Sequence, residues 1–448
     1  MTVAIDLFSG AGGLSEGFRQ ANFDVRLGLD LAPHACATHE DNFSEGTTWC
    51  RDVLDVSGAD VRAAVGGDVE VVVGGPNCQG VSERGSRDPH DPRNRMFWEF
   101  IRLIEELKPR AFLMENVAGL THRHNWPLLQ SVVRALMQLG YACGGDVVRA
   151  ADYGVPQLRH RFILLGVRDH RGPVPFPRPT HAEMNDLGLF PIASPGRLPH
   201  VTLRDAISDL PPVPSGGGGA TMNYDCPAET PYQTEMRLGS EVVLNHRASA
   251  VADVNLERIR FIPEGGNWKD IPAELLPPRF FQCRLTDHST TYARLRWDHP
   301  AFTLTALFGN VTAGAYTHPE QNRALTVREG ARIHGFPDRF RFQGPLNSQY
   351  RQIGNAVPPL LARAFGDHLA EYLGSGRFPS DAVQPRLPGD LIVSSGWDAV
   401  PVLTPRYRGL FGTGTRWPKG WGPEPDDRRT LLTDNYRLKR VPESIAAA

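Results

Sequence analysis

The strongest constraint on the fold is the alternation of apolar runs with helix-like segments along the first 170 residues. The runs TVAIDLF, VRLGLD, VEVVVGG, AFLMEN and RFILLGV are short, apolar and closed by turn-forming or polar residues. Between them, FWEFIRLIEEL and LLQSVVRALMQLG have helical spacing. Strands that are apolar on both faces and alternate with helices indicate a parallel sheet covered on both sides. The sequence therefore predicts an α/β fold.

The pattern changes after Val167, which suggests a second domain. The segments RDHRGPVPFPRPTH and PPVPSGGGGATMNY cannot continue a packed sheet, and residues 172–300 lack clear periodicity. Helical spacing returns in LTVREGARIHGF and in NAVPPLLARAFGDHLAEYL, which has proline near its first turn. We therefore divide the chain into a first domain (1–170), a smaller, mostly irregular domain (171–345), a C-terminal helix that completes the first domain (346–375) and an extension (376–448).

The composition excludes several classes of protein. No run of about 18 apolar residues exists, so no membrane span is predicted. The N-terminus has no basic segment before an apolar one, so no secretory signal is predicted. The six cysteines form no C-x-x-C pair, which argues against a disulfide framework and a structural zinc site. We expect a cytoplasmic protein without a metal site.

The charge of the chain gives an ambiguous signal. The net charge of −2 does not indicate a polyanionic partner. Residues 321–352 are locally basic, however, with six arginines against Glu329 and Asp338, while lysine occurs only four times in the whole chain. Arginine suits bidentate contacts with phosphate and base edges. The codon usage of a GC-rich genome explains an arginine excess equally well.

The segment DLFSGAGG has the position of a ligand-binding loop between a strand and a helix. Glycine at positions 10 and 12 allows a ligand to approach the backbone closely. Asp30 ends the second strand, where an acid can bind ribose hydroxyls, and Asp52 lies where a third strand should end. The layout is that of a nucleoside-cofactor site. Because Ser15 replaces the third glycine of G-x-G-x-x-G, the loop does not distinguish a nicotinamide dinucleotide from S-adenosylmethionine.

Cys78 follows the apolar strand VEVVV in the turn GGPNCQG. Ligands of open parallel sheets bind at the carboxyl ends of the strands, so this thiol is expected beside the cofactor. A single cysteine is more often a small buried hydrophobic residue. That interpretation fits poorly here, because Gly74, Gly75 and Pro76 form turns and do not pack a core.

Five segments in this order resemble the successive motifs of the C5-cytosine DNA methyltransferases: DLFSGAGGLSEGF, GGPNCQGVS, MENV, PQLRHR and QIGNAVPP. The resemblance covers residues 1–170 and 300–373. Residues 172–300 fall where this family has its variable target-recognition domain, and the tail beyond 376 has no counterpart. The resemblance implies a Rossmann-like, S-adenosylmethionine-dependent methyltransferase sheet with a second, smaller target-recognition domain.

The resemblance also implies a catalytic mechanism. Cys78 would add to carbon 6 of a flipped cytosine, which activates carbon 5 toward the methyl group. Glu115 would protonate or hydrogen-bond the ring at N3, with Asn116 positioning its carboxylate. Arg161 would hold O2 of the base and orient Glu115, and Arg159 would contact the adjacent backbone phosphate.

Further residues are assigned to ligands by the same resemblance. S-adenosylmethionine would contact residues of the first domain and of the GNAVPP segment: Asp6, Phe8, Gly10, Gly12, Asp30, Leu31, Asp52, Val53, Pro76 and Asn355. Double-stranded DNA would contact Gln79, Ser82, Arg93, Arg159, Arg284 and Arg296, with Arg279 and Arg294 as further candidates. We expect a monomer on DNA, in a restriction–modification or phage-defence system whose other subunits are additional partners.

Departures from the family pattern leave alternatives open. Asn77 replaces the second proline of the usual Pro-Pro-Cys-Gln, and Asp30 stands where glutamate is commoner. An RNA cytosine-5 methyltransferase is one alternative, although its Cys-Phe-Thr signature is missing. A catalytically weak DNA-binding subunit is another, whereas a nicotinamide dehydrogenase leaves Cys78 and Glu115 unexplained. The tail, with three tryptophans, is either a partner-docking element or a cover for the core.

Overall fold

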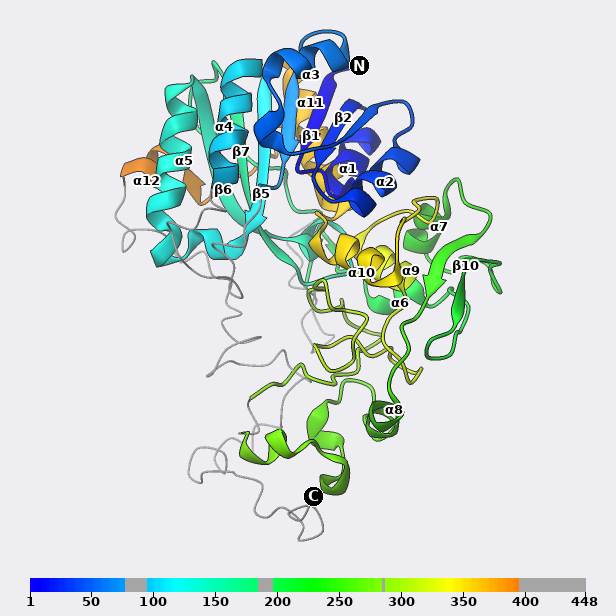
Figure 1. The fold of residues 1–448 in the computed structure, drawn as a ribbon. Coiled ribbons are helices and arrows are strands. Elements are labelled where there is room, and N and C mark those ends of the chain that lie inside the picture. The colour runs from blue at the N-terminus through cyan, green and yellow to red at the C-terminus, as the bar shows by residue number, and fades with distance from the viewer. Residues whose placement is uncertain (77–94, 184–195, 284–286, 395–448) are drawn as a thin grey trace.

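The computed structural model describes residues 1–76, 95–183, 196–283 and 287–394. Within them an eight-stranded sheet forms the centre of the upper part of the molecule (Figure 1). Its strands, in sheet order, are β12 (Leu387–Pro388), β6 (Tyr141–Arg149), β7 (His160–Arg168), β5 (Ala111–Val117), β4 (Val71–Gly74), β1 (Val3–Leu7), β2 (Asp24–Asp30) and β3 (Thr47–Cys50).

The sheet is mixed and not wholly parallel. β1 to β5 run parallel, as predicted. β7 runs antiparallel to both of its neighbours, β5 and β6. Residues 150–159 connect β6 to β7, and a parallel crossover needs a dozen or more residues, so these strands pair as antiparallel neighbours. The prediction of a parallel sheet is therefore correct for β1 to β5 and wrong for β7.

Helices cover both faces of the sheet. One face is covered by α1 (Gly13–Gln20), α2 (Pro33–Asn42) and α11 (Pro359–Ser375), and the other by α3 (Gly58–Val65), α4 (Arg95–Leu107) and α5 (Trp126–Gln138) (Figure 1). Alternate residues of a strand point to opposite faces, so Ala4 joins the core under α1, while Ile5 and Leu7 join the core under α4.

The last long helix, α11, packs directly on α1. Glycine makes this close contact possible. A Cβ on Gly13 would lie 2.2 Å from the carbonyl oxygen of Val357, and one on Gly17 would lie 2.5 Å from that of Pro359. The chain therefore returns from the second region to cover the first helix.

Residues between β7 and α11 form a second region with little regular structure, below the sheet in Figure 1. Its helices are α6 (Leu203–Ile207), α7 (Pro231–Arg237), α8 (Asp253–Ile259), α9 (Val327–His334) and α10 (Leu346–Asn355). Its strand pairs are β8 (His181–Ala182) with β9 (Leu198–Pro199), and β10 (Gly218–Met222) with β11 (Val243–Arg247). Short 3-10 turns and loops make up most of the remainder.

The basic segment 321–352 is largely internal. Arg323, Arg328 and Arg332 are fully buried. Arg323 pairs with Glu329 at 2.7 Å and Arg332 with Asp338 at 2.6 Å. Arg328 donates hydrogen bonds to three backbone carbonyls. These arginines therefore brace the second region and offer no surface to a nucleic acid.

The first part of the extension completes the sheet. β12 pairs with β6, and α12 (Gly389–Ser394) packs against α5 and β6. Ile392 is fully buried, and Arg386 pairs with Asp146 at 2.6 Å. An uncovered edge strand is prone to pair with other chains, so residues 376–394 protect the edge at β6. Of the two functions considered for the tail, these residues serve as a cover; residues 395–448 lie outside the described part.

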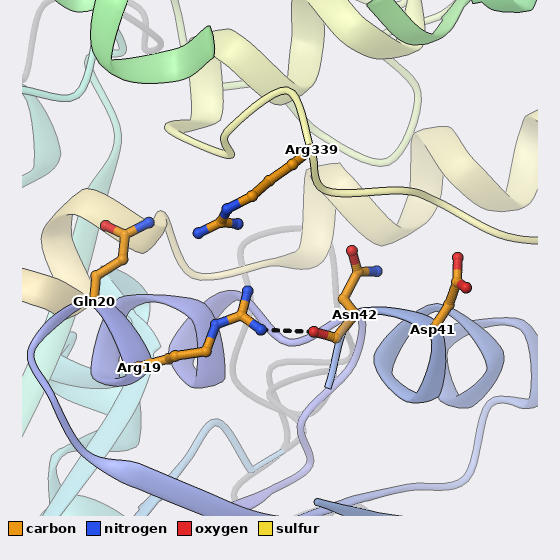
Figure 2. Close-up of a pocket in the computed structure, with 5 residues that line it drawn as sticks. All are labelled: Arg19, Gln20, Asp41, Asn42 and Arg339. Carbon is orange, nitrogen blue, oxygen red and sulfur yellow. Dashed lines mark hydrogen bonds between the residues drawn. The ribbon is translucent and has the colours of Figure 1, made fainter. Parts of the chain in front are cut away.

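A pocket of about 490 Å³ lies between the C-terminal ends of α1 and α2 and a loop of the second region (Figure 2). It is lined by Arg19, Gln20, Asp41, Asn42 and Arg339. Arg19 donates to the carbonyl oxygen of Asn42 at 2.6 Å, and both Arg19 and Arg339 pair with buried Glu16. The glycine loop precedes the N-terminal end of α1, whereas this pocket is at the C-terminal end of the same helix. The pocket therefore lies away from the predicted site.

Candidate active site

The loop between β1 and α1 has left-handed backbone at three positions. Phe8, Gly10 and Gly12 have φ values of 62°, 55° and 97°. A Cβ on Gly10 would meet nothing within 4 Å, so Gly10 borders open space. A Cβ on Gly12 would lie 2.5 Å from the ring of Phe43. The two glycines therefore differ in function: Gly10 leaves the backbone open to a ligand, and Gly12 is required by internal packing.

Asp30 connects this loop to the end of β2. Its Oδ2 accepts a hydrogen bond from Gly10 N and its Oδ1 one from Ala32 N, both at 2.8 Å. Each carboxylate oxygen retains a lone pair for a hydroxyl donor. Leu31, the next residue, is 65% exposed. An open backbone, a carboxylate and an exposed apolar side chain thus meet at one edge of the sheet.

Asp52 and Val53 follow the end of β3. Oδ1 of Asp52 accepts a hydrogen bond from Leu54 N at 3.0 Å and caps the 3-10 turn Val53–Asp55. Val53 is only 3% exposed and belongs to the core under α4. The side chain of Val53 is therefore part of the core, and the cofactor contact predicted for this residue stays a prediction.

Asp6 lies beneath the glycine loop. Its side chain is fully buried, and Oδ2 accepts hydrogen bonds from Ser15 N (3.1 Å) and Ser15 Oγ (2.7 Å). Ser15 Oγ is 3.1 Å from His39 Nε2, and His39 Nδ1 is 2.7 Å from Thr48 Oγ1. Burial raises the pKa of Asp6 to about 7 and lowers the pKa of His39 to about 4.

This buried chain of polar groups gives the Asp6 side chain a structural function, and the cofactor contact predicted for Asp6 stays a prediction. The carboxyl supports the first turn of α1 from inside and is not directed at a ligand in solvent. Ser15 and His39 were not recognised from the sequence as part of the site. Their only signal was a serine in place of the third glycine, which the structure explains as the partner of Asp6.

Glu115 and Arg161 come together at the ends of β5 and β7. Arg161 Nε is 2.7 Å from Glu115 Oε1, and their side chains are 14% and 12% exposed. A Cβ on Gly75 would lie 3.2 Å from Glu115 Oε2, so that oxygen is next to the turn after β4. Burial raises the pKa of Glu115 above its ordinary value, against the lowering effect of the guanidinium groups of Arg161 and Arg159.

Asn116 joins β5 to the same turn. It is 2% exposed, and its Nδ2 donates to the carbonyl oxygen of Pro76 at 3.0 Å. We had expected this amide to position Glu115, but here it fixes the turn two residues before Cys78. Cys78 and Asn77 lie outside the described residues.

Arg159 does not have the position expected of a phosphate ligand. It is 1% exposed, and it donates to the carbonyl oxygens of Leu304 (2.8 Å), Gly354 (2.9 Å) and Ala356 (3.2 Å). The predicted phosphate contact is therefore wrong for this arrangement. Arg159 instead holds the backbone on both sides of Asn355, which is exposed as a ligand-binding residue should be.

Comparison with known proteins agrees with this geometry. The family model for C-5 cytosine-specific DNA methylase matches residues 2–371. The chain belongs to this family. As a member, it is a DNA (cytosine-5-)-methyltransferase, and the predicted Rossmann-like methyltransferase fold is confirmed. The extension that covers β6 lies beyond the matched residues.

Several relatives of this methyltransferase support the assignment. It is 34% identical over 422 residues to the Type II methyltransferase M.AgeI of Thalassovita gelatinovora, which covers 81% of this chain and 98% of that protein. It is 35% identical over 367 residues to the Type II methyltransferase M1.HphI of Haemophilus parahaemolyticus, which covers 81% and 85%. A crystal structure of a candidate DNA modification methyltransferase from an E. coli prophage has a TM-score of 0.65 and 25% identity, covering 84% of this chain and 100% of that one.

The DNA contacts predicted for this methyltransferase are only partly described. Gln79, Ser82, Arg93 and Arg284 lie outside the described residues. Arg296 pairs with Asp298 at 3.0 Å, and its side chain is 23% exposed. Arg294 is 4% exposed and donates to backbone carbonyls, so the contact considered for it is wrong. In the part of the chain that the structure describes, no helix is long and apolar enough to cross a membrane.

Proposed function

We propose that this protein transfers a methyl group from S-adenosylmethionine to carbon 5 of cytosine, at a specific sequence in double-stranded DNA. The observation that carries the proposal is the Glu115–Arg161 pair, which lies against the Gly75–Pro76 turn that leads to Cys78. Glu115, an acid of raised pKa, lies near the carboxyl end of β5, and the orienting guanidinium of Arg161 comes from the beginning of the antiparallel strand β7. The nucleophile, Cys78, would follow the turn after β4. Ring activation of cytosine requires this combination.

The residues at the ends of β1, β2 and β3 fit S-adenosylmethionine. Gly10 leaves open space at the N-terminal end of α1, and Asp30 has lone pairs for the ribose hydroxyls. Leu31 offers an exposed apolar surface to adenine, and Asp52 a carboxylate to its amine. Asn355, held by Arg159, would close the site. When bound, the cofactor supplies the activated methyl group.

Glu115 and Arg161 would act on the flipped cytosine. Because burial raises its pKa, Glu115 keeps a proton to higher pH than an ordinary glutamate and can hydrogen-bond N3 as charge develops on the ring. Arg161 binds Oε1, so Oε2, next to Gly75, is the oxygen available to the base. Arg161 thus fixes the direction in which the proton is presented and would bind O2 of the base.

Cys78 would be the nucleophile. Its thiolate adds to carbon 6 of the ring and leaves again after methyl transfer and loss of the proton from carbon 5. Asn116 would position the loop that carries Cys78, since it hydrogen-bonds Pro76 O. The Type II methyltransferases among the relatives support a restriction–modification setting, and residues 171–345 would read the DNA sequence.

The test is methylation of unmodified, mixed-sequence DNA by the purified protein with S-adenosylmethionine, with the product mapped by bisulfite sequencing. Cys78→Ser removes the nucleophile, and Cys143→Ser is the matched control because Cys143 is buried in β6 and its thiol donates to the carbonyl oxygen of Tyr141, which a serine hydroxyl can also do. We expect 5-methylcytosine at one recurring motif, lost in Cys78→Ser and retained in Cys143→Ser. Methylation that persists in Cys78→Ser would refute the mechanism. Methylation of RNA alone would refute the substrate.

A further inference from the structure

Two free cysteines lie together at the predicted adenosine end of the site. Cys36 is on α2, and Cys50 is the last residue of β3, directly opposite Asp30 in the parallel pairing of β2 and β3. Cys36 Sγ donates to the carbonyl oxygen of Asp30 at 3.4 Å, and Cys50 Sγ donates to that of Leu31 at 3.9 Å. The two thiols therefore contact the carbonyl groups of consecutive residues.

The two thiols differ in accessibility. Cys50 is exposed, whereas Cys36 is 5% exposed. Burial, with added effects of Cys50 and the Asp30 carboxylate, raises the pKa of Cys36. A reagent in solution therefore reaches Cys50 first, and Cys36 reacts efficiently only with a partner held beside it. The thiols of the other described cysteines, Cys143, Cys226 and Cys283, donate to the carbonyl oxygens of Tyr141, Asp209 and Arg279 instead.

We propose that Cys36 and Cys50 are a thiol–disulfide modification site whose oxidant is a low-molecular-weight disulfide such as oxidised glutathione. The thiolate of Cys50 attacks one sulfur of the oxidant, forms a mixed disulfide and releases one thiol. Cys36 loses its proton to water and attacks the Cys50 sulfur, which releases the second thiol. Two protein thiols and one small disulfide thus yield one protein disulfide and two small thiols.

The disulfide would change the cofactor site, a consequence that rests on the proposed function. A disulfide has no S–H donor and brings its sulfurs to about 2.05 Å. Oxidation therefore removes the hydrogen bonds to the Asp30 and Leu31 carbonyls and pulls α2 toward β3. Asp30 also holds Gly10, so the movement reaches the glycine loop. The expected consequence is the loss of one hydrogen bond between the Asp30 carboxylate and a ribose hydroxyl of the cofactor. Losing one hydrogen bond to a charged group weakens binding by about tenfold or more.

The experiment treats the full chain with oxidised glutathione, blocks the remaining thiols and identifies the cysteines by peptide mass spectrometry. We expect a Cys36–Cys50 linked peptide as the main product of this region. Cys36→Ser should stop at a stable mixed disulfide on Cys50, and Cys50→Ser should give neither product. Cys226→Ser is the control and should form the linked peptide as the wild type does.

A mixed disulfide that persists on Cys50 of the folded wild type would overturn the proposal, as would two unmodified thiols. These readouts do not depend on methyl transfer, so they are distinct from a failure of the proposed function. Calorimetric titration with S-adenosylmethionine then compares the reduced and oxidised proteins. Equal affinity would refute the effect on the cofactor site, and weakening by about tenfold or more, reversed by dithiothreitol, would support it.

Discussion

Ionisation of Asp6 should make the protein less stable as pH rises. The carboxyl is fully buried, its Oδ1 has no hydrogen-bond partner among the described residues, and its pKa is about 7 against 3.8 for an ordinary aspartate. Because the folded-state pKa lies above the unfolded one, the stabilising contribution is complete below about pH 4 and is lost as pH rises through about 7. A difference of about three pKa units corresponds to about 4 kcal/mol, of which about 3 kcal/mol is lost between pH 5 and 8.

Asp6→Asn isolates this contribution. The amide oxygen can still accept the hydrogen bonds of Ser15, and the side chain cannot ionise. Urea denaturation at pH 5, 6, 7 and 8 should show the free energy of unfolding of the wild type falling by about 3 kcal/mol relative to Asp6→Asn. Asp68→Asn is the control, because the Asp68 side chain is 92% exposed. Parallel curves for the wild type and Asp6→Asn would show that Asp6 is not held protonated and would refute the reasoning.

Other substitutions test the site and the packing around it. Glu115→Gln should lower kcat by about 100-fold or more and leave S-adenosylmethionine affinity unchanged, as measured by initial rates and calorimetry; unchanged kcat would remove Glu115 from the chemistry. Gly17→Ala should lower the free energy of unfolding by about 1–3 kcal/mol, because the added Cβ would collide with α11. This cost exceeds the gain from the better helix propensity of alanine. A raised melting temperature would contradict this prediction. Truncation after Gly376 removes buried Ile392 and the cover of β6, so it should lower the free energy of unfolding in urea by about 3 kcal/mol or more. Truncation after Ser394 keeps both and should leave the free energy of unfolding unchanged. Equal stability of the two truncated proteins would contradict the proposed cover.

The strands predicted from their apolar runs are β1, β2, β4, β5 and β7, and β3 was expected from the position of Asp52. β6 was not predicted, because Gly144 and Gly145 occupy its middle and glycine is typical of turns. Packing explains both residues: a Cβ on Gly144 would lie 2.3 Å from Val174 O, and one on Gly145 would lie 2.9 Å from the ring of Phe162. Such contacts come from distant parts of the chain and leave no local pattern in the sequence.

The order of the motifs was sufficient to predict which residues of the site lie together. It was not sufficient to predict which side chains of a motif are buried and therefore have a structural function. Glu115 and Arg161 were expected together, and the pair is present in the structure. Arg159, two residues away in the sequence, was assigned to phosphate, yet its partners are carbonyls near residues 304 and 355. Residues 159 and 161 belong to the same motif, and nothing within it shows which side chain enters the core.

The excess of arginine over lysine has a structural explanation in the second region. Loops without a strand or helix ladder leave buried carbonyl groups that still require donors. One guanidinium carries five N–H groups in a planar fork, so a single arginine can satisfy several carbonyls, which the compact ammonium of lysine does less well. Arg294, Arg328 and Arg159 each donate to at least three backbone carbonyls. Part of the positive charge of this chain is therefore buried, and its DNA surface must be sought among arginines that are exposed, such as Arg279 and Arg351.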